Sequence, residues 1–269
     1  MKLSYLNKTV NLKIPKTTIR LKQEIIDKLY EEFEPEPIPV YENERFKQQV
    51  SKYETEKNLE EVPVKVIGQW ISGGADSSLL AYLLCKKIKE ENLNVKYQPI
   101  SVRRGRPWNP VYAAQVLEWI ENDLQIDFML PHEIYYPPLI DSEMTETKIF
   151  WEKDNQNFRE GKFQILYSGI TLNPPKDVDI SLNKERNRDD DGTEKPVETR
   201  NGLRHYINPF FTINKKWEAE AYKDLGLLDT LFPLTRSCEG SDYETGNYTF
   251  HCGGCWWCEE RMWAFGRLE

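Results

Sequence analysis

The feature that most constrains the fold is a short polar loop between an apolar strand and an apolar helix. The strand is predicted over Val64–Ile71, and the loop reads Ser72-Gly73-Gly74-Ala75-Asp76-Ser77-Ser78. Two adjacent glycines allow a tight turn and a close approach of the backbone to a ligand, because they carry no Cβ. Backbone N–H groups at the start of the helix then favour an anion. We predict a phosphate-binding loop; the simpler alternative is a Gly-Gly turn in which Asp76 or Ser77 only caps the helix.

The loop differs from the two most common nucleotide-binding motifs. It lacks the lysine that ends a Walker A loop and the third glycine of the dinucleotide-binding fingerprint. A nest of backbone N–H groups with neighbouring hydroxyls suits a pyrophosphate group. The sequence therefore indicates a pyrophosphate group as the ligand, held by a loop of a different type.

Predicted strands and helices alternate along the rest of the chain. Further strands are predicted near 95–102, 126–130 and 163–168, and helices near 111–123, 143–159 and 215–225. This alternation is typical of a parallel sheet with helical crossovers. We therefore predict an α/β fold: a parallel sheet of about five strands with flanking helices, and a small metal-binding element at the C-terminal end.

Residues 1–62 precede this alternation and are predicted to form an N-terminal appendage and linker. An extended stretch leads to a helix that Thr17 or Thr18 would cap and that reaches Phe33; prolines then separate it from a second helix over 44–61. The purpose of this appendage does not follow from its sequence.

Charge marks a second unusual segment, within the main domain that we place at 63–234. More than half of residues 176–204 are charged, which predicts a solvent-exposed insert, or alternatively a lid that substrate orders. The chain as a whole carries a formal charge of −8, which argues against a general nucleic-acid coat. It has no apolar run long enough to cross a bilayer and no apolar leader, so we expect a cytoplasmic protein with no membrane partner.

Four of the five cysteines crowd into the last part of the chain, which we predict to be a metal-binding element over 235–269. They are Cys238, Cys252, Cys255 and Cys258. A set of four thiolates favours a tetrahedral structural Zn²⁺ site, and an iron–sulfur cluster or two disulfides are the alternatives. The fifth, Cys85, falls within the predicted helix after the loop and is expected to be a core residue.

The loop resembles the PP-loop of the N-type ATP pyrophosphatases, whose signature is Ser-Gly-Gly-x-Asp-Ser after a first strand. The C-terminal part resembles 7-cyano-7-deazaguanine synthases of that superfamily. It carries Thr235-Arg236-Ser237-Cys238, Cys252-Gly253-Gly254-Cys255-Trp256-Trp257-Cys258, Arg261 and Ala264-Phe265 in the family's order. Pro209 and Lys215 match the family's Pro-x5-Lys segment, and Gly105 and Gly169 match family glycines after strands. The matching blocks cover residues 64–105 and 205–266.

The resemblance implies an ATP-dependent, AMP-forming carbon–nitrogen ligase with Mg²⁺. A carboxylate on 7-carboxy-7-deazaguanine is adenylated in that family, ammonia displaces AMP, and further ATP drives dehydration to the nitrile. By resemblance, Asp76, Ser77 and Lys215 are the catalytic candidates, and the residues expected to hold ATP are Ser72, Gly73, Gly74, Asp76, Ser77, Ser78, Gly105, Gly169 and Lys215. The partners expected are a small-molecule acceptor and ammonia.

The chain departs from this family where the family holds its acceptor. Arg103, Arg104 and Arg106 replace an Asp-Tyr-Gly-Gln segment, and the family's later acidic motif is missing. Guanidinium groups favour phosphate or carboxylate, which indicates a more anionic acceptor; the alternative is a solvated turn. A tRNA- or DNA-thiolating enzyme and a non-catalytic, zinc-stapled ATP-binding module remain the other hypotheses. The tail tryptophans are expected to pack the metal element or a contact between two copies in a homodimer.

Overall fold

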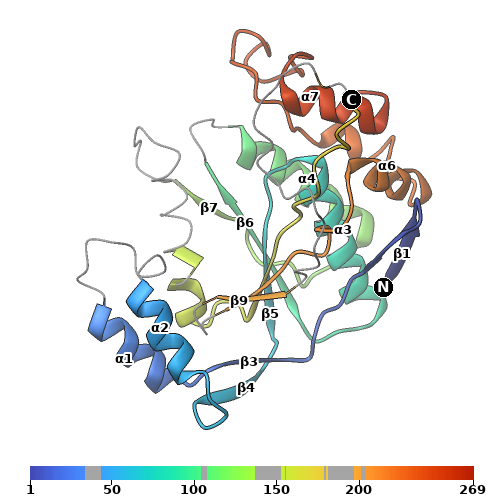
Figure 1. The fold of residues 1–269 in the computed structure, drawn as a ribbon. Helices are drawn as coiled ribbons and strands as arrows, with labels where there is room; N and C mark the ends of the chain where they lie inside the picture. Colours follow the sequence, from blue (N-terminus) through green and yellow to red (C-terminus); the bar gives the residue numbers. More distant parts are fainter. Residues whose placement is uncertain are drawn as a thin grey trace.

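The centre of the molecule is a six-stranded sheet (Figure 1). The computed structural model describes residues 1–33, 44–103, 108–136, 153–154, 156–178, 180, 197–200 and 204–269. In spatial order the strands are β7 (Glu133–Tyr135), β6 (Lys96–Val102), β5 (Val66–Trp70), β8 (Ile165–Tyr167), β10 (Arg204–Ile207) and β9 (Val197–Arg200). All neighbours pair in parallel except β9, which runs antiparallel to β10. The predicted α/β fold with five parallel strands is confirmed.

One strand prediction and the prediction for the charged insert need correction. Only Met129 of the predicted strand at 126–130 forms a bridge, to Tyr97, and the edge strand β7 begins at Glu133 instead. Gln125 adopts a left-handed conformation with φ 48° and ends the preceding helix. The residues that follow therefore connect this helix to the edge strand of the sheet instead of forming a strand themselves. The charged insert at 176–204 also contributes structure, since β9 lies within it.

Helices pack against the sheet and follow its strands along the chain. Their bounds are α3 (Ala75–Glu90), α4 (Asn109–Leu124), α6 (Lys215–Asp224), a 3₁₀ turn η2 (Phe232–Leu234) and α7 (Trp256–Phe265). Helix α3 is buried nearly all round, as expected for a helix between a sheet and other helices. Helix α6 begins at Lys215 because the Asn214 side chain accepts hydrogen bonds from the N–H groups of Lys216 and Trp217. Of the helix predicted at 143–159, residues 153–154 and 156–159 are described and are helical.

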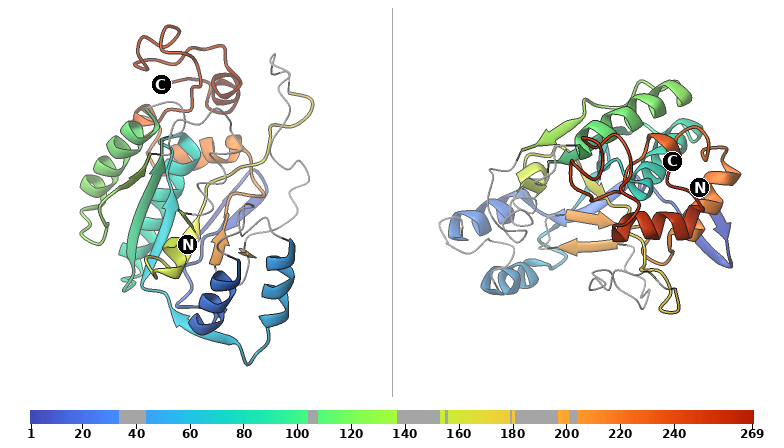
Figure 2. Two further views of the ribbon diagram at one scale, coloured as in Figure 1. Left: turned by 90° about the vertical axis from the view of Figure 1, so that its left-hand side faces the viewer. Right: turned by 90° about the horizontal axis from the view of Figure 1, so that it is seen from above.

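The first residues form a hairpin that packs against α6 (Figures 1 and 2). Strands β1 (Lys2–Tyr5) and β2 (Lys8–Asn11) pair in antiparallel fashion. The rings of Tyr5 and Trp217 meet edge to face with centroids 5.0 Å apart, and the Trp217 indole N–H donates to the Lys8 carbonyl at 3.0 Å. The hairpin therefore braces the helix that carries Lys215.

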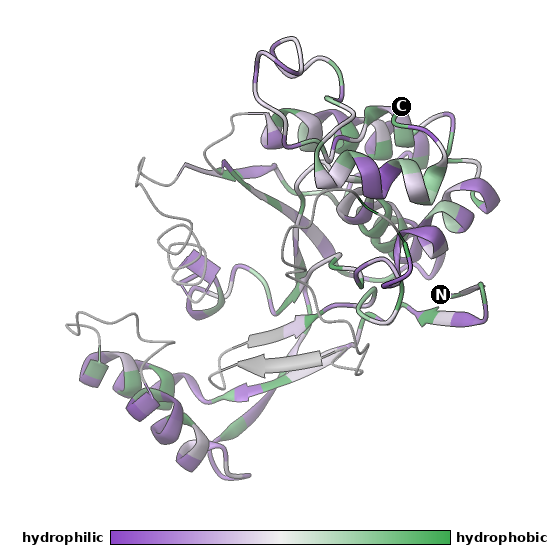
Figure 3. Ribbon diagram, turned by 45° about the horizontal axis from the view of Figure 1, so that its top comes forward, coloured by the Kyte–Doolittle hydropathy of each residue, from purple (hydrophilic) through white to green (hydrophobic). Residues whose placement is uncertain are grey.

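Residues 17–33 and 44–63 form a separate small layer at the end of the molecule opposite the cysteine-bearing element (Figures 1 and 2). It contains β3 (Thr17–Leu21), α1 (Gln23–Phe33), α2 (Glu44–Tyr53) and β4 (Leu59–Pro63). Both helices alternate hydrophobic and hydrophilic residues (Figure 3), and their apolar faces share one cluster around Phe33 and Phe46. Two predictions were wrong here: Thr17 and Thr18 lie in β3 rather than capping a helix, and α2 ends at Tyr53 because β4 follows.

The main core lies between the sheet and α3, α4 and α6, and residues of the hairpin join it. Among the helices that the structure describes, none is both long enough and apolar enough to cross a membrane.

Candidate active site and metal centre

The loop after β5 is held in a closed turn by its own hydroxyls. The Ser77 hydroxyl accepts from the Ser72 N–H at 3.2 Å and donates to the Gly74 carbonyl at 3.2 Å. The Ser72 hydroxyl in turn accepts from the Gly74 N–H at 3.3 Å. Gly74 precedes the first residue of α3 and has no side chain with which to cap it. The first N–H groups of the helix therefore remain open to an anion, as a phosphate site requires.

Two glycines are required by close backbone contacts. Gly73 has a φ of +77°, and a Cβ on it would lie 2.6 Å from the Tyr112 Cβ. A Cβ on Gly169 would lie 3.0 Å from the Asp76 carbonyl oxygen. The loop is thus pressed between α4 on one side and the chain after β8 on the other.

Buried hydrogen bonds fix the first turn of α3 from below. The Gln69 amide donates to the Ser77 carbonyl at 2.7 Å and accepts from the Tyr97 hydroxyl at 2.8 Å. The Tyr222 hydroxyl donates to the Ala75 carbonyl at 2.9 Å. Both groups bind carbonyls that point away from the open N–H groups, so the anion-binding end keeps its geometry without a ligand.

A cavity of about 530 Å³ opens above the loop. Ser72, Gly74, Asp76 and Ser77 line it from the loop, and Lys215 lines it from α6. The other lining residues are Trp70, Ile71, Val102, Trp108, Asn109, Asp154, Ser168, Gly169, Ile170, Thr171, Tyr206, Arg236, Ser237, Glu239 and Trp257. This volume lies in the usual range for small-molecule sites, and it lies beyond the carboxyl ends of β5 and β8, where ligands of open α/β sheets bind.

Lys215 is a buried cation of the cavity, with 2% of its surface exposed. Its ammonium lies 3.0 Å from Oδ1 of Asp76 and 3.2 Å from Oε2 of Glu260. The Trp257 ring lies against the same ammonium, 5.5 Å from its centroid. A buried ammonium shared by two carboxylates can turn toward a phosphate that enters the cavity.

A further carboxyl, Glu218, joins this cluster from the next turn of α6. Its side chain is fully buried, and burial, followed by the charge of Asp76, raises the pKa of Glu218 well above its ordinary value. Both effects favour the neutral acid form of Glu218.

The loop is tied to the metal centre by the backbone before Cys238. The Arg236 N–H donates to the Gly73 carbonyl at 2.7 Å, and the Ser237 hydroxyl lies beside Gly74. The Arg236 side chain is buried over the Trp108 and Tyr112 rings and donates to the Phe250 carbonyl. The segment that leads to Cys238 therefore contacts the loop directly.

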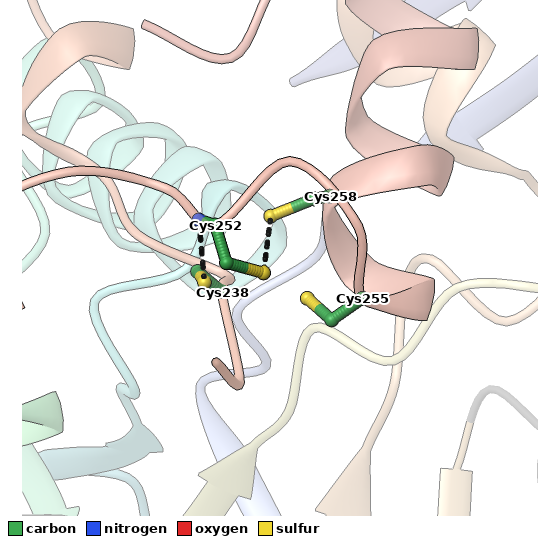
Figure 4. Close-up of side chains that lie close together, drawn as sticks. All are labelled: Cys238, Cys252, Cys255 and Cys258. Atoms are coloured by element: carbon green, nitrogen blue, oxygen red, sulfur yellow. Dashed lines mark hydrogen bonds between the residues drawn. The ribbon is translucent and has the colours of Figure 1, made fainter. Parts of the chain in front are cut away.

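The four C-terminal cysteines converge at one point (Figure 4). Their sulfur atoms all lie within 4.8 Å of one another, and the sulfurs of Cys252 and Cys258 are 3.9 Å apart. A disulfide needs about 2.05 Å, and all five cysteines are unpaired thiols. A tetrahedral Zn²⁺ with Zn–S bonds of about 2.3 Å places its sulfurs about 3.8 Å apart, so the donor set fits a four-thiolate metal centre.

Backbone N–H groups prepare these sulfurs for the charge of a thiolate. The Cys238 sulfur accepts from the N–H groups of Gly240 and Cys252 at 3.3 Å each, and the Cys255 sulfur accepts from the Glu239 N–H at 3.4 Å. Contacts from the Cys255 and Cys258 thiols lower the pKa of Cys238 most, and these N–H groups add to the effect. Cys85, by contrast, is fully buried in the core, and desolvation raises the pKa of its thiol.

Aromatic and acidic side chains also line the cavity. The Trp70 indole N–H donates to Asp154 at 3.3 Å, and both residues line the cavity with Tyr206 and Trp257. A flat ring with N–H groups along its edge matches such a surface.

The structure places most of the predicted ATP-binding residues together. Ser72, Gly74, Asp76, Ser77, Gly169 and Lys215 line the cavity. Gly73 packs against α4, and Ser78 is buried and is not one of the residues that line the cavity. Gly105, Arg104 and Arg106 lie outside the described residues. Arg103 is exposed, with its guanidinium 6.0 Å from the Tyr136 ring centroid.

The sequence did not single out Glu218, Glu260 or Arg236 as site residues. Glu218 stands three positions after Lys215, a spacing that places two side chains on one helical face, and this was the available signal. Arg261, a residue of the C-terminal motif, binds the Thr235 hydroxyl at 2.8 Å and the Phe232 carbonyl at 3.1 Å through its guanidinium, so it braces the segment before Cys238.

Neither the known protein families nor the curated proteins gave a match to this chain. Several solved structures resemble it distantly, and two of them are described here. The U34-tRNA thiolase NcsA from Methanococcus maripaludis, determined with its 4Fe–4S cluster, is 15% identical with a TM-score of 0.42, over 82% of this chain and 76% of the thiolase. NAD+ synthetase from Burkholderia pseudomallei is 12% identical with a TM-score of 0.35, over 90% of each chain. Likenesses this distant do not carry an activity to this protein.

Proposed function

We propose that this protein is an ATP-dependent, AMP-forming ligase that activates a carboxylate and joins it to ammonia, as 7-cyano-7-deazaguanine synthases do. One observation carries the proposal. The loop Ser72–Ser77 presents open N–H groups and hydroxyls to a cavity into which Lys215 also projects. An anion site beside a buried cation suits the pyrophosphate group of ATP.

The reaction takes place in two displacements. A carboxylate oxygen of the acceptor attacks the α-phosphorus of ATP, the bond to the bridging oxygen breaks, and pyrophosphate leaves. Ammonia then attacks the acyl carbon, the carbon–oxygen bond breaks, and AMP leaves with that oxygen. In the resembling family a second ATP converts the amide to a nitrile.

The residues of the chain supply charge stabilisation and position. The loop N–H groups and the Ser72 and Ser77 hydroxyls would hold the departing pyrophosphate, and Lys215 would balance the charge that moves onto it. Mg²⁺ bound with ATP offsets the remaining phosphate charge. Chemistry of this kind needs no protein nucleophile, and Cys85, the one cysteine outside the metal set, is fully buried.

The four-cysteine centre is proposed to hold a structural Zn²⁺ that fixes the segment 235–238 against the loop. The sulfur separations and the N–H···S bonds support it. A 4Fe–4S cluster is the competing occupant of four cysteines.

Oxygen-18 in the acceptor carboxylate tests the reaction directly. Purified protein is incubated with ATP, Mg²⁺, ammonia and labelled 7-carboxy-7-deazaguanine, and the masses of the products are determined by mass spectrometry. We expect AMP that carries one labelled oxygen and an acceptor that has gained nitrogen. AMP formation with tRNA and a sulfur donor instead would support thiolation, and ATP binding without turnover would support the non-catalytic module.

A further inference from the structure

The side chain of Arg236 is a buried cation to which the proposed chemistry gives no role. It is 2% exposed and lines the cavity. The guanidinium carbon lies 5.9 Å from the Trp108 ring centroid and 5.4 Å from that of Tyr112. Nη1 donates to the Tyr112 hydroxyl at 3.3 Å, and Nη2 donates to the Phe250 carbonyl. These contacts fix the guanidinium in position, but each of them is made with a neutral group.

No carboxylate in the described part of the chain neutralises this charge. Arg236 forms no ion pair there, and its Nε–H has no acceptor. The more exposed Arg20 and Arg267, by contrast, each pair with a carboxylate at 2.8 Å. A charge removed from water is costly unless an opposite charge replaces its lost hydration. Arg236 therefore bears an electrostatic cost that a bound anion would relieve.

A second buried arginine of the C-terminal element differs from Arg236 in its acceptors. The Arg261 guanidinium donates to the carbonyls of Leu268, Phe232 and Thr235 and to the Thr235 hydroxyl, at 2.6–3.2 Å. It has four acceptors, and Arg261 is not one of the residues that line the cavity. Arg236 has two acceptors and does line the cavity. The contrast assigns a structural role to Arg261 and leaves Arg236 with binding capacity for a ligand.

The start of helix α4 adds further positive character beside Arg236. Trp108 and Asn109, which both line the cavity, are the N-cap and the first residue of this helix, and no side chain of the described residues caps it. The Trp108 indole N–H is buried and has no acceptor within those residues. The amino end of a helix carries a partial positive charge. One wall of the cavity therefore combines a guanidinium, an unused N–H donor and the positive end of a helix.

We infer that Arg236, with the Trp108 indole N–H, forms a second anion site in the cavity, for a phosphate or carboxylate group. A guanidinium binds either group through paired N–H donors, and stacking on aromatic rings holds it ready to do so. The loop is assigned to the pyrophosphate part of ATP, so this second anion belongs to the acceptor or to the α-phosphate of the nucleotide. That choice of ligand rests on the proposed function, whereas the anion site itself does not.

Three variants remove separate parts of this site and keep the backbone hydrogen bond from residue 236 to Gly73. Arg236→Gln removes the charge, Arg236→Lys keeps the charge but not the planar pair of donors, and Trp108→Phe removes the indole N–H. The matched control is Arg267→Gln, because Arg267 belongs to the same C-terminal element, pairs with Asp229 and does not line the cavity. Melting temperature and metal content are measured for every variant.

The first experiment is calorimetric titration in two steps. The protein is titrated with an ATP analogue that has a methylene bridge between the α and β phosphorus atoms, and the saturated protein is then titrated with inorganic phosphate. We expect phosphate to bind beside the analogue, roughly tenfold more weakly in Arg236→Gln, less weakened in Arg236→Lys and Trp108→Phe, and unchanged in Arg267→Gln. This result would assign the site to an anionic group of the acceptor.

The same titrations identify the other source of the anion. A roughly tenfold loss of affinity for the analogue in Arg236→Gln, with no phosphate bound beside it, would assign the site to the nucleotide. If Arg236→Gln binds both probes as wild type does, the inference is overturned. A fall in melting temperature or metal content alone would then show that Arg236 only stabilises the four-cysteine centre.

Kinetics connect the site to the proposed reaction. If the acceptor supplies the anion, Arg236→Gln should raise the KM for the acceptor roughly tenfold and leave the KM for ATP unchanged. A protein that makes no AMP with any acceptor would refute the proposed function, while the phosphate titrations would still decide whether the anion site exists.

Discussion

The Arg236 N–H donates a 2.7 Å hydrogen bond to the carbonyl of Gly73, the loop glycine whose φ is +77°. Arg236 lies two residues before Cys238, so one short backbone segment joins the four-cysteine centre to the proposed phosphate site. The centre is therefore expected to support the loop as well as the fold.

Loss of a metal ligand should thus weaken nucleotide binding as well as stability. We predict about one Zn²⁺ per chain by metal analysis of protein purified without chelator. In Cys258→Ser the melting temperature should fall and an ATP analogue should bind more weakly, because metal-binding energy is folding energy. Cys85→Ser is the control outside the centre. A brown protein that contains iron and sulfide would show that the centre holds an iron–sulfur cluster instead of zinc. A Cys238–Cys252 disulfide would exclude both zinc and a cluster.

Substitutions in the loop should remove activity without unfolding the protein. Asp76→Ala and Ser77→Ala should abolish AMP formation, and Lys215→Ala should lower it by roughly a hundredfold or more. Ser77 and Lys215 would contact the departing pyrophosphate, and the Asp76 carboxylate holds the Lys215 ammonium at 3.0 Å. Lys216→Ala is the matched control, because the Lys216 side chain is exposed and lies over Trp263. Unchanged ATP turnover in Asp76→Ala or Ser77→Ala would remove the loop from the mechanism.

Gly73→Ala should destabilise the protein by roughly 2–4 kcal/mol, from a strained φ and the clash with α4. The comparison is Gly254→Ala, where a Cβ would meet nothing within 4 Å. Chemical denaturation of both variants measures the difference. A Gly73→Ala protein as stable as wild type would mean that the loop can move away from Tyr112.

His132 should make stability depend on pH in the acid range. Its Nε2 lies 2.7 Å from the Ser101 hydroxyl, and burial lowers the pKa of His132 to about 4. The unfolded chain binds a proton near the ordinary value of 6.5, so the native state loses stability as pH falls from 6.5 toward 4. His132→Gln should flatten this part of the curve of melting temperature against pH. An equally steep curve in the variant would assign the acid sensitivity to other groups.

The acceptor site can be tested through the arginines after β6. Reversing charge at Arg103 and Arg104 should raise the KM for an anionic acceptor far more than the KM for ATP. Rapid turnover of free 7-carboxy-7-deazaguanine, with no kinetic change in those variants, would show that the arginines only form a solvated turn.

Short sequence patterns predicted the phosphate-binding loop and the cysteine cluster, because both depend mainly on neighbouring residues. The strand–loop–helix at Val64–Leu84 and the cysteine spacing each specify their geometry within a few turns of chain, and both appear in the structure. The edge strand was misplaced because its partner, β6, decides which residues pair, and periodicity does not contain that information. Glu218 was missed for a similar reason: only the packing of α6 against α3 brings its carboxyl to Asp76.

The site is assembled from segments that are far apart in the chain, and this has a consequence during synthesis. The loop at 72–77 emerges from the ribosome early, but Lys215, Arg236 and Glu260 follow only after the whole sheet has been translated. Until then the loop lacks the Lys215 ammonium and the hydrogen bond from the Arg236 N–H to Gly73, so a nascent chain should not retain ATP. Arrested chains of increasing length should gain nucleotide binding in one step, after the residues through α7 have left the exit tunnel.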